Sequence, residues 1–155
     1  MKRDTKKIGT VSELMVTAAL VSNGYRLLLP YGDNARYDVV IEGFDGGFSR
    51  VQVKTGRLEH GMIEFNGYSS HSHRGGVSTR VYRGEIDFFG VYCPQVNSCY
   101  LVPASEVNTH GCLRIDPPRN GQTKGIRWAD SYRLDLRATE LRVGTSAEHV
   151  VRLGA

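Results

Sequence analysis

Three polar side chains of kinds that act on phosphate esters occur in two short runs: Asp38 in "YDVVIE", and Gln52 and Lys54 in "RVQVKTG". Carboxylate and amide oxygens are hard ligands of the kind that Mg²⁺ binds. A bound metal ion lowers the pKa of a water ligand and offsets charge on a phosphate, and a nearby ammonium group stabilises developing negative charge. These residue types therefore predict metal-dependent hydrolysis of a phosphodiester.

The predicted ligands of the metal ion are Asp38, the side-chain oxygen of Gln52 and the main-chain carbonyl of Val53. Lys54 would orient the attacking water, help to remove its proton or stabilise the pentavalent phosphate. We predict Mg²⁺ as the cofactor, with Mn²⁺ able to replace it. The same residues also fit a solvated strand face on which Asp38 pairs with Lys54 beside a bystander Gln52. The spacing by itself leaves both interpretations open.

A hairpin is needed to bring these residues together. Residues 36–42 and 48–54 alternate polar and apolar side chains, which is typical of half-buried strands, and the Gly-rich stretch 43–47 predicts the turn between them. In the antiparallel register Asp38 lies opposite Gln52, and both share a face with Lys54 because strand side chains alternate. A slip of one residue would bury Asp38 and expose the apolar set. That set, predicted to face the core, is Val39, Ile41, Val51 and Val53.

A helix is predicted for residues 10–23, with Thr10 and Glu13 as a capping box and Gly24 as its end. Residues 67–83 are rich in Gly and Ser and predict a long loop. The other predicted elements are strands at 25–30, 62–66, 85–94, 98–103 and 112–115, a short helix at 104–107, and a short helix or extended segment at 125–134. This order predicts a mixed α/β domain whose central sheet packs against the first helix.

The hairpin motif resembles the signature of the PD-(D/E)XK nucleases, in which an acid at one strand start is followed by (D/E)-x-K on the next strand. Three blocks add to the likeness: "LLLPYGDNARYDVVIE…RVQVKTGR", "YSSHSHRGG…YRGEIDFFGVYCP…YLVP" and "NGQTKGIRWADSY". In this order they are similar to the group I intron homing endonucleases of the PD-(D/E)XK class, which carry a Gln variant of the motif. The similarity covers residues 8–134.

The resemblance implies a PD-(D/E)XK nuclease-like core and Mg²⁺-dependent cleavage of double-stranded DNA at a long site by an oligomer. It also implies a metal ligand, direct or through water, at Glu13, because the helix before the hairpin often supplies a Glu in this superfamily. The capping box explains Glu13 equally well. Two positions depart from the usual pattern: Tyr37 stands where Pro is frequent, and Gln52 replaces an acid, which weakens metal affinity unless Glu13 compensates.

Basic segments suggest where a polyanion would bind. The chain carries a net charge of +4, and residues 71–83 and 119–127 contain basic residues without an acid. Each segment also fits a solvated surface. The candidate DNA contacts are Arg57, His71, His73, Arg74, Arg80, Arg83, Asn120, Gln122, Lys124 and Arg127.

Length and composition set the remaining expectations. The 155 residues predict one nuclease domain, with a core at about 8–134 and a tail at 135–155. The three cysteines form no C-x-x-C pair, which argues against a zinc knuckle and a disulfide framework. No apolar run approaches a membrane span or a signal-peptide core, so we expect a cytoplasmic, nucleoid-associated protein without a membrane partner. One site per chain and two strands per duplex predict a homodimer or homotetramer.

The sequence leaves other functions open, and one of them is an RNA-acting nuclease, although no residue pattern selects the 2′-hydroxyl group. A resolvase of Holliday junctions would use the same hairpin site in a dimer, and preference for junctions over linear duplex would distinguish it. A catalytically inactive DNA-binding module is suggested by Gln52. Such a module would bind DNA in a salt-sensitive manner without any metal-dependent product.

Overall fold

The computed structural model describes residues 4–32, 34–135, 139–143 and 149–153. Its single α-helix within that part, α1 (Thr5–Ser22), begins earlier than predicted. Asp4 is the N-cap and its Oδ1 accepts a hydrogen bond from the Lys7 N–H at 3.1 Å. Thr10 lies inside the helix, where its hydroxyl donates to the Lys6 carbonyl, so the predicted capping box with Glu13 was wrong. Residues 5–7 are polar, so apolar periodicity gave no sign of the first turn.

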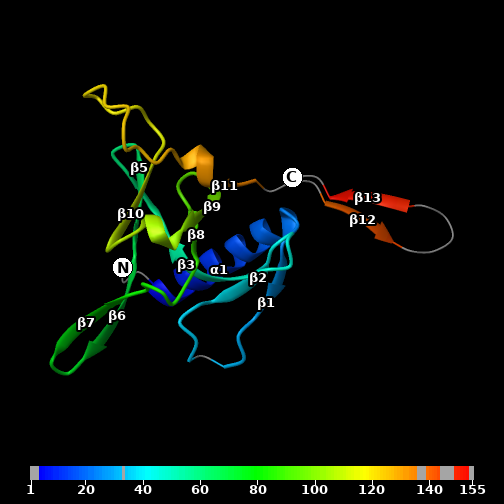
Figure 1. Cartoon of the computed structure of the whole chain (residues 1–155), viewed down its shortest axis with the longest axis horizontal. Helices are drawn as coiled ribbons and strands as arrows, with labels where there is room; N and C mark the ends of the chain where they lie inside the picture. Colours follow the sequence, from blue (N-terminus) through cyan, green and yellow to red (C-terminus); the bar gives the residue numbers. More distant parts are fainter. Residues whose placement is uncertain (1–3, 33, 136–138, 144–148, 154–155) are drawn as a thin grey trace.

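The strands and short helices follow α1 along the chain and are shown in Figure 1. They are β1 (Arg26–Leu28), β2 (Val39–Glu42), β3 (Phe48–Thr55), β4 (Arg57–Glu59), β5 (Met62–Asn66), β6 (Tyr68–His73), β7 (Gly76–Val81), β8 (Phe88–Cys93), β9 (Ser98–Pro103), η1 (Ala104–Glu106), β10 (His110–Arg114), η2 (Ala129–Tyr132), β11 (Arg133–Leu134), β12 (Thr139–Val143) and β13 (His149–Leu153). The predicted tail thus contains a β12–β13 hairpin, and its residues 136–138, 144–148 and 154–155 lie outside the described residues.

The central sheet has six strands in the order β1-β2-β3-β8-β9-β11. Its β3–β8 pair is parallel and the others are antiparallel, so the sheet is mixed. A second sheet has the order β10-β5-β4, and β6 and β7 form a separate hairpin. The predicted mixed sheet with an N-terminal helix packed on it is confirmed.

Residues 67–83 form the β6–β7 hairpin rather than the predicted loop. Its strands pair from Tyr68 with Val81 to His73 with Gly76, around a turn at residues 74–75. Most of the hairpin is exposed on both faces, so the polar–apolar alternation that identifies a half-buried strand is absent. The short strand β4 was missed as well, and 112–115 proved to be part of an edge strand of the second sheet.

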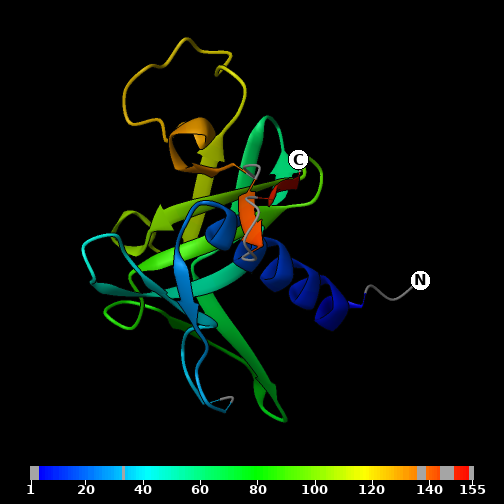
Figure 2. The same ribbon diagram turned by 90° about the vertical axis from the view of Figure 1, so that its right-hand side faces the viewer.

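The predicted register of the β2–β3 hairpin is confirmed: Glu42 pairs with Phe48 and Val40 with Arg50. The predicted apolar set is buried and packs against α1, which lies across the strands in Figure 2. Gly90 on β8 permits this approach, because a Cβ there would lie 2.6 Å from Val16 Cγ1 of the helix.

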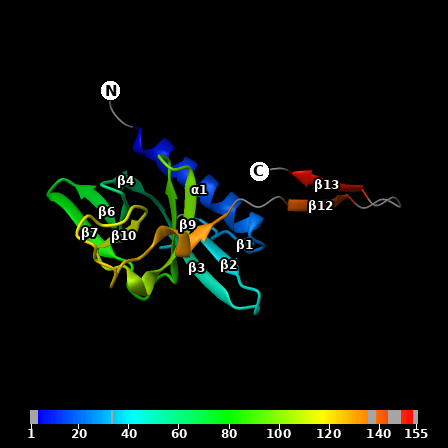
Figure 3. The ribbon, with the colours of Figure 1, turned by 90° about the horizontal axis from the view of Figure 1, so that it is seen from above.

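The opposite face of the central sheet carries a second core. Phe89 and Val91 of β8 pack with Ile63 and Phe65 of β5 and with Leu113 of β10. Figure 3 shows β4, β10 and the β6–β7 hairpin gathered on one side of the central strands. The face of β3 with the polar motif is therefore bordered by a core instead of being fully solvated.

Candidate active site

Polar groups of Asp38, Gln52 and Val53 converge where β2 begins beside the middle of β3. The Asp38 N–H donates to the Val51 carbonyl at 3.0 Å, which extends the hairpin ladder and places Asp38 beside Gln52. Asp38 Oδ2 accepts hydrogen bonds from Gln52 Nε2 at 2.6 Å and from the Val53 N–H at 2.7 Å. Gln52 Nε2 also lies 3.3 Å from the Val53 carbonyl oxygen. Two of the three oxygens predicted to bind metal, Asp38 Oδ2 and the Val53 carbonyl, thus both point at Gln52 Nε2.

A divalent cation fits this donor set. Gln52 Nε2 lies between Asp38 Oδ2 and the Val53 carbonyl, so a cation would meet a charged and a neutral oxygen there once the amide nitrogen turns away. A rotation of the Gln52 amide would turn Oε1 toward the ion and supply a third. Within the described chain, no group of three His, Cys, Asp or Glu side chains is placed to hold a metal ion. The predicted ligands at the β2–β3 hairpin carry less negative charge than those of the standard motif, because the Gln52 amide takes the place of an acid.

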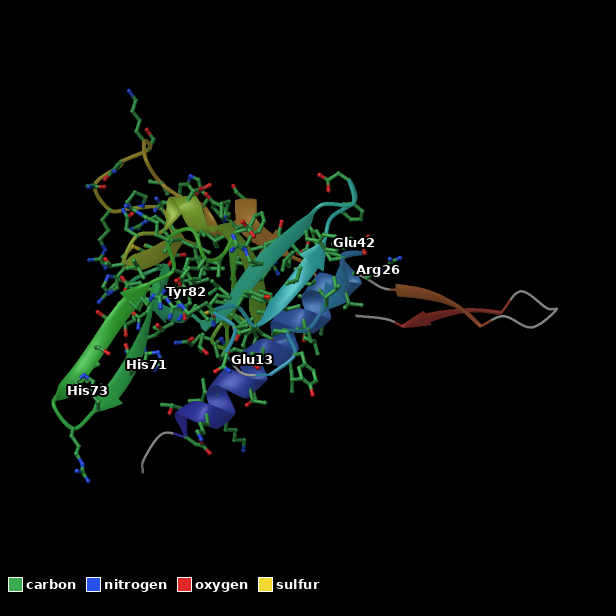
Figure 4. The ribbon with its side chains drawn as sticks, turned by 60° about the horizontal axis from the view of Figure 1, so that its bottom comes forward. Glu13, Arg26, Glu42, His71, His73 and Tyr82 are labelled. Carbon is green, nitrogen blue, oxygen red and sulfur yellow. The ribbon has the colours of Figure 1, made fainter. Side chains whose placement is uncertain are left out.

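Glu13 lies on α1 (Figure 4), where it is exposed. Its pKa is raised by partial burial and then by the negative charge of Asp38. The pKa of Asp38 is also raised, chiefly by burial, although the Val53 N–H, Lys54 and Gln52 oppose the shift. Since Asp4 caps the helix, capping no longer explains Glu13. The charge of Asp38 thus acts on the Glu13 carboxyl group.

Lys54 is half-buried, and its Nζ donates to the Tyr68 carbonyl at 2.9 Å and to the Tyr82 hydroxyl at 3.3 Å. Burial lowers its pKa to about 8, with the charge of Asp38 acting against the shift and that of Arg36 adding to it. A lysine with this pKa is partly neutral near physiological pH. It can therefore accept a proton from water or donate one to a phosphate oxygen.

Arg36 was not identified from the sequence, yet it connects the segment before β2 to the β6–β7 hairpin. Its Nε donates to Glu85 Oε2 and one Nη to the Ser69 hydroxyl, each at 2.6 Å, while the other Nη donates to the Val81 carbonyl at 3.1 Å. Its guanidinium lies 4.3 Å from the centre of the Tyr82 ring. Only its place two residues before Asp38 hinted at a role.

Four predicted DNA contacts lie on the β6–β7 hairpin: His71, His73, Arg74 and Arg80. All four are exposed, and Figure 4 shows both histidines along the projecting arm. Arg80 also pairs with Glu85. Arg83 is exposed just after the hairpin.

The other predicted contacts lie elsewhere on the surface. Asn120, Gln122 and Lys124 are exposed on the segment between β10 and η2, where Gln122 Nε2 donates to the Lys124 carbonyl at 3.0 Å. Arg127 and Arg57 each have an acidic partner, Glu106 at 3.5 Å and Glu59 at 3.0 Å. Figure 1 shows this segment and the β6–β7 hairpin at opposite ends of one side of the molecule.

Asp87 begins the apolar run of residues 87–92, a position that favours a buried, hydrogen-bonded acid over a metal ligand. In the structure it binds Arg50. Its Oδ2 accepts from the Arg50 N–H at 2.7 Å and lies 3.1 Å from Arg50 Nε. The Arg50 guanidinium holds the pKa of Asp87 below its usual value. The acid is therefore accounted for by this pair, although it is half-exposed instead of buried.

Comparison with known proteins gives two positive results. A family model described as "PD-(D/E)XK endonuclease" matches residues 3–135. Among solved structures, a bacterial homing endonuclease, I-Ssp6803I, superposes with a TM-score of 0.67 at 22% sequence identity, covering 84% of this chain and 89% of that one. A search of curated protein sequences finds no match. No described helix is long and apolar enough to cross a membrane.

Proposed function

Because the chain belongs to the PD-(D/E)XK endonuclease family, we propose that it cleaves double-stranded DNA at specific sites with Mg²⁺ as its cofactor. The observation that carries the proposal is the convergence of Asp38 Oδ2, the Gln52 amide and the Val53 carbonyl beside Lys54. Members of this family generally use divalent metal ions, and the three groups offer oxygen ligands suited to Mg²⁺ or Mn²⁺.

Each residue has a distinct proposed role. Asp38, Gln52 Oε1 and the Val53 carbonyl would hold the ion, and Glu13 would bind it directly or through water. When bound, the ion lowers the pKa of a water molecule and offsets phosphate charge. Lys54 orients the water or accepts its proton as the water oxygen attacks phosphorus. The bond from phosphorus to the leaving oxygen then breaks, and the departing oxygen takes a proton from solvent.

DNA would lie along the side of the molecule that presents the β6–β7 hairpin and the segment between β10 and η2. These two regions carry seven of the ten candidate contacts, His71, His73, Arg74, Arg80, Asn120, Gln122 and Lys124. The solved relative is a homing endonuclease, which supports a long target site. Since one chain offers one such site and a duplex has two strands, we propose a homodimer or homotetramer of a single nuclease domain whose core spans about residues 8–134.

The test is cleavage of pooled genomic duplex DNA with Mg²⁺ or with EDTA, followed by sequencing of the new ends. We expect discrete ends only with the metal, and loss of about a hundredfold or more in rate for Lys54→Ala and Asp38→Asn. Asp45→Asn is the matched control, because Asp45 lies in the turn of the same hairpin and accepts a local hydrogen bond from the Gly47 N–H. Cleavage that survives in Asp38→Asn would refute the assignment of the site.

One alternative has an observation of its own. The Gln52 amide leaves the cluster with fewer negative charges than the standard motif, which favours a DNA-binding module without catalysis. Salt-sensitive DNA binding without new ends, on both linear duplex and four-way junctions, would support that module. Cleavage confined to junctions would instead identify a resolvase.

A further inference from the structure

The base of the β6–β7 hairpin surrounds the Lys54 ammonium group. The Tyr68 carbonyl, at the start of β6, accepts from Lys54 Nζ at 2.9 Å. Tyr82, directly after β7, contacts it twice: its hydroxyl lies 3.3 Å from Nζ, and its ring centre lies 4.7 Å away. Both ends of one hairpin therefore hold the side chain assigned to catalysis.

Tyr82 is itself held in place from several sides. Its side chain is buried, with 6% exposure. Its ring meets Phe89 edge-on at 5.8 Å, and the Arg36 guanidinium lies 4.3 Å from the ring centre. Arg36 is anchored in turn by Glu85 and Ser69. These contacts fix the position of the Tyr82 side chain, whereas a lysine side chain has a long flexible stem.

We propose that Tyr82 is a positioning residue of the nuclease site: its ring and hydroxyl hold Lys54 Nζ beside the Asp38 cluster for reaction with the water or the phosphate. This inference rests on the proposed function. Attraction between a cation and an aromatic face strengthens when the pair is desolvated, as it is here. Correct placement of a catalytic group matters greatly, since a misplacement of 1 Å can cost about a hundredfold in rate.

A purely structural role for Tyr82 makes different predictions. If Tyr82 were only a core aromatic residue, it would support the fold through its contact with Phe89. Tyr82→Phe would then leave the cleavage rate unchanged, because phenylalanine keeps the ring. As a positioning residue it would change the rate of the chemical step without changing DNA affinity. The split between binding and turnover therefore distinguishes the two roles.

The cleavage test uses the full-length chain under single-turnover conditions with Mg²⁺, beside a DNA-binding measurement in Ca²⁺. For Tyr82→Phe we expect about a tenfold loss of rate, since one hydrogen bond to a charged group is removed. For Tyr82→Leu we expect about a hundredfold loss, since ring and hydroxyl both go. The control is Tyr100→Phe, which alters another buried tyrosine of the same core cluster. Wild-type rates in both Tyr82 variants would overturn the proposal.

A second measurement is independent of cleavage. NMR of lysine side chains, with the Lys54 signal assigned from its loss in Lys54→Arg, reports the ring current of Tyr82. We expect a displaced wild-type signal that moves toward the values of exposed lysines in Tyr82→Leu and shifts less in Tyr82→Phe. A wild-type signal already at exposed values would overturn the proposal, even if Tyr82→Leu fails to fold. If the wild type cleaves no DNA, the proposed function fails, and this comparison still decides whether Tyr82 holds Lys54.

Discussion

Replacing Gln52 with glutamate tests the geometry of the proposed metal site without relying on activity. Gln52 Nε2 donates to Asp38 Oδ2 at 2.6 Å, so Gln52→Glu puts an oxygen where a donor now lies. The variant also restores the acid of the standard motif. The same change should therefore weaken the metal-free protein and strengthen metal binding.

The expected loss of stability follows from the hydrogen bond between Gln52 and Asp38. Loss of a hydrogen bond to a charged acceptor costs about 1.5–3 kcal/mol, and two unit charges about 4 Å apart repel by about 4 kcal/mol at an effective dielectric constant of 20. Uptake of a proton by one carboxyl limits the total penalty. We expect the free energy of unfolding in EDTA at pH 8 to fall by about 2–4 kcal/mol relative to the wild type.

The dependence on pH and metal provides the controls. As the pH falls, the new carboxyl becomes protonated and can donate to Asp38, so the difference from the wild type should shrink. Mg²⁺ should stabilise Gln52→Glu by about 2.7 kcal/mol at a hundredfold excess over the variant's dissociation constant, and should stabilise the wild type by less because the wild type binds the ion more weakly. Urea unfolding with Mg²⁺ or EDTA at two pH values measures all three effects. Gln122→Glu, an exposed substitution of the same kind, should show none of them.

Two results would refute the reasoning. A Gln52→Glu variant as stable as the wild type in EDTA would mean that the amide does not donate to Asp38. Equal stabilisation of variant and wild type by Mg²⁺ would mean that position 52 does not face the ion.

Three further predictions concern the scaffold. Gly90→Ala should lower the free energy of unfolding by about 1–3 kcal/mol, because the new methyl group would overpack against α1. Gly9→Ala should raise it by about 1 kcal/mol, because Gly9 lies in open space on the helix. Urea unfolding measures both changes. Asp87→Asn should cost about 1 kcal/mol or less at pH 7, because its pair with Arg50 is half-exposed. Since the folded pKa of Asp87 lies below 3.8, this stabilisation is fully present above that pH and is lost as the pH falls through the folded pKa. The difference between variant and wild type in parallel unfolding curves should therefore be smaller at pH 3 than at pH 7. Arg36→Lys should speed proteolysis of the β6–β7 hairpin about tenfold by loosening its anchored base; an unchanged cleavage rate would contradict this role.

The sequence by itself determined the β2–β3 hairpin and the grouping of Asp38, Gln52 and Lys54. Both depend on neighbouring residues: a Gly-rich turn sets the register, and alternation sets which side chains share a face. The apolar set on the other face had to be buried, which excluded a slipped register. The helix was also predicted, although its start was misplaced. Asp4 caps the helix, and the polar residues 5–7 that follow it carry no apolar periodicity.

The surroundings of Lys54 depend on tertiary packing and could not be predicted from the sequence. Tyr68 and Tyr82 lie 14 and 28 residues further along the chain, on a hairpin whose strands lack a buried face. Arg36 reaches the same hairpin through contacts that no local pattern encodes. Periodicity reports which side of an element is buried, whereas the burial that lowers the pKa of Lys54 to about 8 comes from packing between distant segments. Local patterns therefore identified the chemical groups, and long-range packing set their environment.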